Sequence, residues 1–311
     1  MDNSIQLNTT PNQPVSMCYV GGTLELRGLD DALAQQASAH LRWDRRSACH
    51  RCPAFVYADL VRYFVKERIV FEDRARGYQE LTLEWRARPT ARPYQREAID
   101  AWIKALGRGI VVLPTGAGKT HVAMMAIADR KRSALIVVPT LDLVRQWYDQ
   151  LKRNFETEVG VVGGGDYSLH PLTVTTYDSA HLHAERFGNR FGLVVFDEVH
   201  HLPSASYQLA AKLNLAPYRL GLTATPERSD GQEAALDELI GPIVYNKQIV
   251  EFTGEYLADY DVETVDVELT AEERAEYDEA RQIYLSFVRQ QGIRMGGPSG
   301  WNDFIRRTAR S

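Results

Sequence analysis

The chain has 311 residues, of which 44% are hydrophobic, a composition typical of a globular protein with room for two or three domains. It has no run of about 18 apolar residues, and its amino-terminal stretch has neither a basic flank nor an apolar segment, so we expect no membrane span, no signal peptide and an intracellular protein. The net charge of −5 excludes a protein that is basic all over, but residues 86–153 carry 13 Lys and Arg against 5 Asp and Glu, whereas residues 197–281 carry 6 against 19. A localised basic surface suits a polyanion, although about half of such runs are solvated faces.

The first part of the chain alternates short apolar runs with polar ones, which predicts three strands and one amphipathic helix. These are the strands Met17–Val20, Thr23–Leu26 and Leu81–Trp85 and the helix Val56–Lys66. The two prolines of the segment 88–93 then mark a linker. We therefore expect a small α+β domain over residues 1–88.

Three cysteines, Cys18, Cys49 and Cys52, are too few for a disulfide-stapled fold and fit a reducing compartment. The C-x-x-C spacing of Cys49 and Cys52 is half of a zinc site, which His50 and Cys18 would have to complete. A zinc ribbon needs a second closely spaced ligand pair, and the sequence has none. We therefore favour cysteines that bind no metal.

From Tyr94 onward, helix-length amphipathic segments such as Leu141–Phe155 alternate with continuous apolar runs. The runs are Ile110–Leu113, Ala134–Val138, Leu172–Thr176, Leu193–Phe196 and Arg219–Leu222. Buried parallel strands joined by crossover helices have this pattern. We predict a doubly wound α/β domain with a parallel sheet over residues 89–250, and ligands at the carboxyl ends of its strands.

The stretch LPTGAGKT follows one of these predicted strands and opens the predicted helix Thr120–Arg130, which is the context that a phosphate-binding loop requires. Its glycines let backbone N–H groups turn toward a phosphate, Lys119 can reach the β- and γ-phosphates, and Thr120 can ligate Mg²⁺. Leu113 stands where the strict pattern has its first glycine. We expect ATP and Mg²⁺ as cofactors, with the nucleotide held by Thr115, Gly116, Ala117, Gly118, Lys119 and Thr120.

Two acidic residues, Asp197 and Glu198, follow the apolar strand Leu193–Phe196. Unpaired buried acids cost several kcal/mol, so two carboxylates at a strand end indicate a function. We expect Asp197 to hold Mg²⁺ through water and Glu198 to orient the attacking water and help deprotonate it.

After residue 242 the chain becomes acidic, and Ala271–Gln291 reads as one long helix. Thr270 with Glu273 three residues later predicts a capping box at its start.

The ordered motifs resemble those of the first motor domain of superfamily-two helicases, which has a RecA-like fold. Asp197, Glu198 and His200 form a D-E-x-H box, and Arg92 with Gln95 resembles the segment that reads adenine. The resemblance places Thr140, Arg145, Thr175, Thr176 and Tyr177 on DNA phosphates, and it places Thr223 and Thr225 in the motif that couples hydrolysis to domain movement. The structural alternative is that the threonines cap helices and Tyr177 lies in the core. Trp147 offers either a stacking surface or, more commonly for its position, a core side chain.

Within the superfamily, the chain most resembles archaeal relatives of the xeroderma pigmentosum group B helicase, the DNA translocase of transcription factor TFIIH. This resemblance implies a 3′-to-5′ DNA helicase or translocase of nucleotide excision repair or promoter opening, with a damage-sensing small domain. It also implies a monomer with DNA and a nuclease, repair or transcription assembly as partners and no membrane, in the cytoplasm of a prokaryote or the nucleus of a eukaryote. Arg228 and Asp230 fall where the family has a strand-separating Arg-Glu-Asp element, and Ser229 stands in place of its glutamate.

Residues 251–311 resemble an acidic segment and the start of the family's helical thumb, and no second motor domain follows. The second motor domain supplies an arginine finger worth about 10³–10⁵ in rate, so we expect this N-terminal half to hydrolyse ATP poorly by itself. One alternative is a non-catalytic module that binds DNA or a partner and loads nucleotide without turnover. Another is the translocating subunit of a restriction enzyme, against which the resemblance of the small domain weighs.

Overall fold

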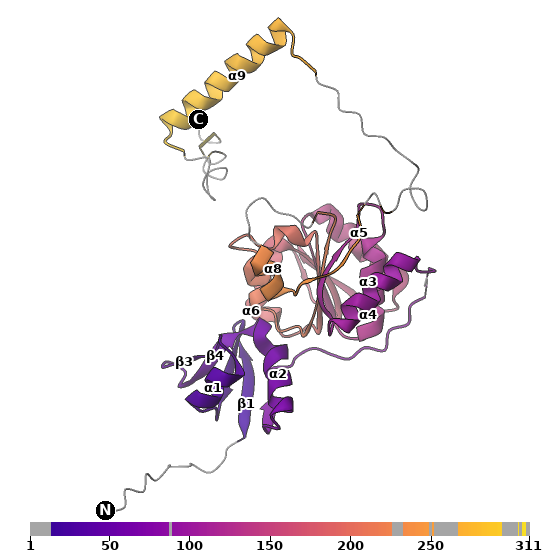
Figure 1. Cartoon of the computed structure of the whole chain (residues 1–311), viewed down its shortest axis with the longest axis vertical. Coiled ribbons are helices and arrows are strands. Elements are labelled where there is room, and N and C mark those ends of the chain that lie inside the picture. The colour runs from indigo at the N-terminus through magenta and orange to yellow at the C-terminus, as the bar shows by residue number, and fades with distance from the viewer. Residues whose placement is uncertain are drawn as a thin grey trace, which may run out of the picture. The chain divides into compact units, whose positions relative to one another are not determined.

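The computed structural model describes residues 14–86, 89–225, 233–248, 251, 267–293, 304, 307 and 308. The chain divides into two compact units, residues 1–256 and 257–311. The first unit contains two separate sheets, one for the small domain and one for the larger domain (Figure 1). None of the helices described is both long enough and apolar enough to cross a membrane.

The small domain is a five-stranded sheet with the order β3-β4-β2-β1-β5, flanked by two helices. Its elements are β1 (Val15–Val20), β2 (Thr23–Arg27), α1 (Asp31–Ala37), β3 (Arg42–Asp44), β4 (Cys49–Pro53), the 3-10 turn η1 (Ala54–Val56), α2 (Tyr57–Lys66) and β5 (Phe71–Asp73). Neighbouring strands are antiparallel except β5, which pairs with β1 in parallel. The predicted α+β organisation of this part is confirmed.

The predicted strand Leu81–Trp85 is wrong. This segment makes isolated bridges at Glu80 and Trp85 and lies along the larger domain, where the Leu81 amide donates to the Lys131 carbonyl at 2.8 Å. Its alternating pattern reflects side chains that pack on helices, because Leu81, Leu83 and Trp85 contact the core of the larger domain. The alternation of apolar and polar residues thus marks a segment with one buried face, although the segment pairs with no strand over its length.

The larger domain is built on an eight-stranded sheet with the order β13-β6-β12-β11-β7-β10-β8-β9. Its strands are β6 (Arg108–Val112), β7 (Ala134–Val138), β8 (Val159–Gly163), β9 (Asp166–Ser168), β10 (Leu172–Thr176), β11 (Leu193–Asp197), β12 (Tyr218–Thr223) and β13 (Ile243–Asn246). Within the described residues every pairing is parallel except that of β8 with β9. The predicted doubly wound parallel sheet is confirmed.

Helices cover both faces of this sheet, which explains its continuous apolar strands. They are α3 (Pro93–Lys104), α4 (Lys119–Arg130), α5 (Leu141–Asn154), α6 (Tyr177–Phe187), α7 (Gln208–Lys212) and α8 (Glu233–Leu239), with the 3-10 turn η2 at Val199–His201. The first three form one core with alternate strand residues such as Val111 and Ile136, and the last three form another with Ile110 and Val137.

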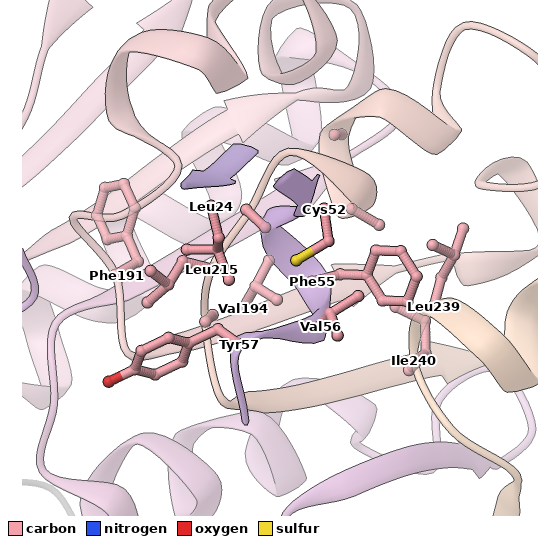
Figure 2. Packing of buried hydrophobic residues seen from close by; sticks show 14 of the residues in the cluster. Leu24, Cys52, Phe55, Val56, Tyr57, Phe191, Val194, Leu215, Leu239 and Ile240 are labelled. Carbon is pink, nitrogen blue, oxygen red and sulfur yellow. The ribbon is translucent and has the colours of Figure 1, made fainter. Parts of the chain in front are cut away.

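The small domain extends the second of these cores. Phe55 and Val56, from η1, belong to the same buried cluster as Leu215, Leu239 and Ile240 of the larger domain (Figure 2). Each large apolar side chain buried in this way contributes about 1.5–3 kcal/mol. The two domains of the first unit therefore share one hydrophobic core.

A tyrosine adds polar contacts to this interface. The hydroxyl of Tyr19 on β1 donates to the carbonyls of Ala184, at 2.8 Å, and Leu213, at 2.9 Å. Burial raises the pKa of Tyr19, which keeps the hydroxyl protonated as a donor. The contact joins the small domain to α6 and to the residue that follows α7 in the larger domain.

The second unit contains α9 (Ala271–Gln290), whose predicted capping box is confirmed. The Thr270 amide donates to the Glu273 carboxylate at 2.8 Å, and the Glu273 amide donates to the Thr270 hydroxyl at 3.3 Å. No residue of α9 is buried.

Candidate nucleotide site and nucleic-acid surface

The phosphate-binding loop joins the carboxyl end of β6 to the first residue of α4, Lys119. Gly116 and Gly118 both have φ of +81°, a conformation that L side chains rarely adopt. A Cβ at Gly118 would also lie 2.5 Å from the side-chain nitrogen of Gln95. The glycines thus keep the backbone open at the amino end of a 12-residue helix, where anions bind.

Two side chains of α3 hold this loop through hydrogen bonds. The amide nitrogen of Gln95 and the hydroxyl of Tyr94 each donate to the Ala117 carbonyl at 2.9 Å. The amide oxygen of Gln95 accepts from the backbone N–H of Arg92 at 3.0 Å, so both ends of the amide are held. The structure assigns Gln95 to positioning the loop, and its contact with adenine stays a prediction.

A cavity of about 370 Å³ lies beside the loop, which is a size suited to a small ligand. Its lining includes the predicted nucleotide residues Arg92, Gln95, Gly116, Ala117, Gly118 and Thr120, together with Pro89, Thr90, His121, Met124, Gln150 and Asn154. Thr115 is exposed at the tip of the loop. Six of the predicted nucleotide residues therefore line one cavity, whereas Thr115 and Lys119 lie outside its lining.

Asp197 ends β11 and is 8% exposed. One carboxylate oxygen accepts from the indole N–H of Trp147 at 2.8 Å, and the other accepts from the Glu198 amide at 3.1 Å. Burial raises the pKa of Asp197 above its ordinary value. The hydrogen bond from Trp147 and the charge of Lys119 offset only part of this rise. The carboxylate is thus dehydrated, oriented and near the lysine of the loop.

Glu198 has φ of +48° and ψ of +56°, a left-handed conformation that costs a non-glycine residue about 1–3 kcal/mol. Its carboxylate lies 3.8 Å from the ammonium group of Lys119, which also donates to the Leu113 carbonyl at 3.3 Å. The loop and the acids come from strands β6 and β11, which are separated in the sheet by β12. The structure brings Lys119 and the acid pair together, as the sequence predicted.

The donor set of this site fits a hard divalent cation. Thr120 and Asp197 offer a hydroxyl and a carboxylate, and Mg²⁺ prefers oxygen ligands of this kind together with phosphate oxygens. By contrast, no group of three His, Cys, Asp or Glu that could hold a metal ion occurs among the described residues. In the C-x-x-C stretch, Cys49 and Cys52 are buried and His50 contacts Asp31 at 2.9 Å.

His200 connects the acids to the predicted coupling motif. Its Nδ1 lies 3.5 Å from the Glu198 carboxylate and 3.1 Å from the Thr223 hydroxyl. That hydroxyl donates to the Thr225 carbonyl at 3.0 Å and accepts from the Thr225 amide at 3.2 Å. The structure therefore unites His200, Thr223 and Thr225 in one network with Glu198.

Two of the predicted DNA residues lie on the surface. Thr140 is exposed at the amino end of α5, where its hydroxyl accepts from the Leu143 amide at 3.4 Å. Arg145, one turn further on, has a side chain 83% exposed, with its nearest carboxylate, Asp142, at 3.8 Å. Both remain available to a phosphate backbone.

The prediction that Thr175 and Tyr177 contact DNA through their side chains is wrong, because both are buried. The Thr175 hydroxyl donates to the Val162 carbonyl at 2.8 Å, and the Tyr177 hydroxyl donates to the Asp197 carbonyl at 3.0 Å. Thr176 is 6% exposed, and its hydroxyl caps α6 by accepting from the Ser179 amide at 3.1 Å. The predicted DNA contact of the Thr176 side chain is therefore also wrong, and the alternative of capping and core roles holds for these three residues.

Two further outcomes concern residues that sequence reasoning left open. Arg228 and Asp230, predicted to face DNA, lie outside the described residues, as does Ser229. Trp147 is a core side chain, 2% exposed, whose N–H orients Asp197. No local signal links residues 50 positions apart on α5 and β11, so that contact could not be read from the sequence.

Comparison with known proteins finds two family models. Residues 17–75 match the xeroderma pigmentosum group B helicase damage recognition domain, and residues 88–228 match the res subunit of type III restriction enzymes. The first covers most of the small domain, and the second covers the phosphate-binding loop, the acid pair and the coupling threonines.

Three curated relatives match between 60% and 90% of this chain. A Sulfurisphaera tokodaii protein named DNA 3'-5' translocase XPB2 is 42% identical over 87% of this chain and 61% of its own length. The DNA 3'-5' helicase XPB of Kineococcus radiotolerans is 40% identical over 60% of this chain and 35% of its own. The helicase/translocase subunit XPB/SSL2 of the general transcription and DNA repair factor IIH of Saccharomyces cerevisiae is 29% identical over 90% of this chain and 36% of its own. The chain thus spans less than two thirds of the length of these relatives.

Proposed function

Because the chain belongs to the XPB family of superfamily-two helicases, we propose that it forms the nucleotide-binding half of an ATP-dependent DNA translocase of 3′-to-5′ polarity. The observation that carries this proposal is the approach of Lys119 and Glu198, 3.8 Å apart, from the ends of two inner strands. A lysine and a carboxylate in this arrangement can serve the two ends of one phosphoryl transfer.

The residues divide the work of hydrolysis by their surroundings. Lys119 neutralises charge on the β- and γ-phosphates, and the N–H groups around Gly116 and Gly118 bind the same oxygens. Thr120 and Asp197 would hold Mg²⁺, which would withdraw charge from the phosphate oxygens. These roles account for a buried carboxylate that is already oriented by Trp147.

Glu198 is better placed than Asp197 to handle the attacking water. Its side chain is 30% exposed, whereas Asp197 is 8% exposed and both of its oxygens already accept hydrogen bonds. The left-handed backbone at Glu198 turns the carboxylate toward Lys119 and holds it there. Glu198 therefore orients the water and accepts its proton.

The network from Glu198 through His200 to Thr223 and Thr225 supports a coupling role. Loss of the γ-phosphate changes the charge that Glu198 faces, and His200 passes this change to the segment that follows β12. We propose that this segment reports the nucleotide state to the DNA-facing parts of the enzyme.

DNA would lie over the amino end of α5, where Thr140 and Arg145 are exposed. Contacts of a hydroxyl and a guanidinium with phosphate oxygens carry no sequence information, so binding is sequence-independent and salt-sensitive. Repair or transcription assemblies are the proposed partners, since the yeast relative is a subunit of factor IIH.

The test measures DNA-stimulated phosphate release by the full-length enzyme that contains this chain. Glu198→Gln should bind nucleotide and lose at least about 100-fold in turnover, the usual effect of removing a positioned base. Glu158→Gln, at a carboxylate 72% exposed and paired with Lys152, is the matched control. Undiminished turnover in Glu198→Gln would remove the assigned role, and nucleotide binding without turnover in the unaltered enzyme would favour a non-catalytic module.

A further inference from the structure

The hairpin of β3 and β4 presents an aromatic side chain at the outer edge of the small-domain sheet. Trp43 on β3 is 53% exposed, although tryptophan is usually well buried in folded proteins. β3 is an edge strand of the sheet, and Trp43 does not belong to the core that the two domains share. Figure 1 shows β3 on the outer edge of the small domain. The packing of the domains therefore does not explain this tryptophan.

Arginines surround Trp43 in the hairpin. Residues 42–51 contain Arg42, Arg45, Arg46 and Arg51 against the single acid Asp44. Arg42, Arg45 and Arg46 are exposed, and none of the described carboxylates forms an ion pair with Arg45 or Arg46. The hairpin is thus a compact positive surface on a chain whose net charge is −5.

The one acid of the hairpin shapes the turn and does not neutralise this surface. Asp44 accepts from the Arg46 amide at 3.0 Å and from the Ser47 hydroxyl at 2.9 Å. It also pairs with Arg51 at 3.2 Å. The Arg46 amide, the Ser47 hydroxyl and Arg51 together lower the pKa of Asp44, as expected for a carboxylate that these groups hold in the turn.

The indole ring rests on a fixed neighbour. Trp43 lies opposite His50 in the β3–β4 register, and the two rings meet edge to face with centroids 5.1 Å apart. His50 is 4% exposed and bonded to Asp31 at 2.9 Å, so it cannot move aside freely. A ring held in this way loses little conformational entropy when a flat ligand stacks on it.

We propose that this hairpin binds unpaired DNA, with a base stacked on Trp43 and neighbouring phosphates on Arg42, Arg45 and Arg46. Aromatic stacking with cationic contacts to the backbone is how proteins bind single strands without sequence preference. A base inside a duplex has no free face, so the surface selects DNA that is distorted or open. The inference rests on the proposed function and deepens it by naming the residues of the small domain that distinguish open DNA from paired DNA.

The experiment compares binding of the whole chain to two labelled duplexes of one length, one fully paired and one with a short central mismatch bubble, by fluorescence anisotropy. Trp43→Ala should weaken binding of the bubble by about 5- to 150-fold and leave the paired duplex within about twofold. Trp43→Phe, which keeps an aromatic face, should restore most of the loss.

The arginines are tested by the double variant Arg45→Gln with Arg46→Gln, which should weaken binding to both duplexes and flatten its salt dependence. The matched control is Lys66→Gln with Arg68→Gln, an equal change of charge at exposed positions at and just after the end of α2 on the same domain. Equal loss in the two double variants would overturn the assignment of the surface to this hairpin.

Arg145→Gln separates the two levels of failure. If Trp43→Ala affects paired and open DNA equally, or neither, while Arg145→Gln weakens both, the stacking proposal is refuted and the DNA role of the motor stands. If the unaltered chain and the full-length enzyme both fail to bind either DNA, the proposed function itself is contradicted.

Discussion

The hydrogen bond from Trp147 to Asp197 offers a sharp test of how the magnesium site is organised. Trp147→Phe keeps most of the ring that fills the core and removes the N–H that donates to the carboxylate at 2.8 Å. Asp197 is 8% exposed, so little water can reach the freed oxygen. The carboxylate then loses its fixed orientation, and we expect weaker binding of Mg²⁺ with nucleotide.

The size of the effect follows from the charge of the acceptor. A hydrogen bond to an ionised group is worth about 1.5–3 kcal/mol, and 1.4 kcal/mol corresponds to a factor of ten in an equilibrium constant. Loss of a partner that orients a metal ligand usually costs about 10- to 100-fold in metal affinity. We therefore expect the Mg²⁺ concentration at half-saturation to rise by about tenfold or more.

Trp102→Phe is the matched control. Trp102 is also fully buried, and its N–H donates to the Arg219 carbonyl at 2.9 Å, with no bond to an acid of the site. Both variants should lower the free energy of unfolding, the control by at least about 1–3 kcal/mol because a buried carbonyl loses its donor and the smaller ring leaves a cavity. The assay titrates Mg²⁺ against binding of a fluorescent ATP analogue. Equal half-saturation in the two variants would refute the positioning role of Trp147.

Three further outcomes are expected. Burial raises the pKa of Asp197, so the melting temperature of the unaltered chain without Mg²⁺ should fall as pH rises from the ordinary pKa of Asp through the raised one, and Asp197→Asn should lack this part of the pH dependence; an unchanged pH dependence in Asp197→Asn would contradict the raised pKa. Tyr19→Phe leaves two motor-domain carbonyls without their donor and should lower the free energy of unfolding in urea by about 1–3 kcal/mol, whereas no change would mean that the contact is unimportant. Gly118→Ala should abolish nucleotide binding, measured by calorimetry, because its Cβ would displace the Gln95 amide.

The loop and the acid pair could be predicted because each signal lies within a short continuous segment. An apolar strand, two glycines and a helix start define the loop, and an apolar strand followed by Asp197 and Glu198 defines the acids. The carboxyl ends of inner parallel strands meet at one edge of the sheet, so local patterns sufficed to bring Lys119 and Glu198 together.

Side-chain direction at the edge of the sheet could not be predicted in the same way. Thr175 lies in a strand that is covered on both faces, and its hydroxyl finds a carbonyl acceptor within the sheet. Tyr177 begins α6, and the phase of that helix turns its ring inward beneath Asp197. Polar atoms suggested exposure at both positions, whereas burial with a satisfied hydrogen bond costs little.

Pairing between distant segments was the other limit. The strands β8 and β13 were not predicted. Two of the five residues of β8 are glycine, and β13 follows Gly241 and Pro242 at the edge of the sheet. The core shared by the small and larger domains depends on long-range contacts such as Phe55 with the Leu239 region. No periodicity within either segment reports on the other.

The most direct test of the central claim is calorimetric titration of the chain with a non-hydrolysable ATP analogue, with and without Mg²⁺. The unaltered chain and Glu198→Gln should both bind in a Mg²⁺-dependent manner, because Glu198 acts on water. Lys119→Ala should lose about 10- to 150-fold in affinity, as expected for removal of a charge-assisted phosphate contact worth about 1.5–3 kcal/mol, and the exposed Lys104→Ala should lose none. Unchanged affinity in Lys119→Ala would contradict a phosphate site formed by the loop and the acid pair.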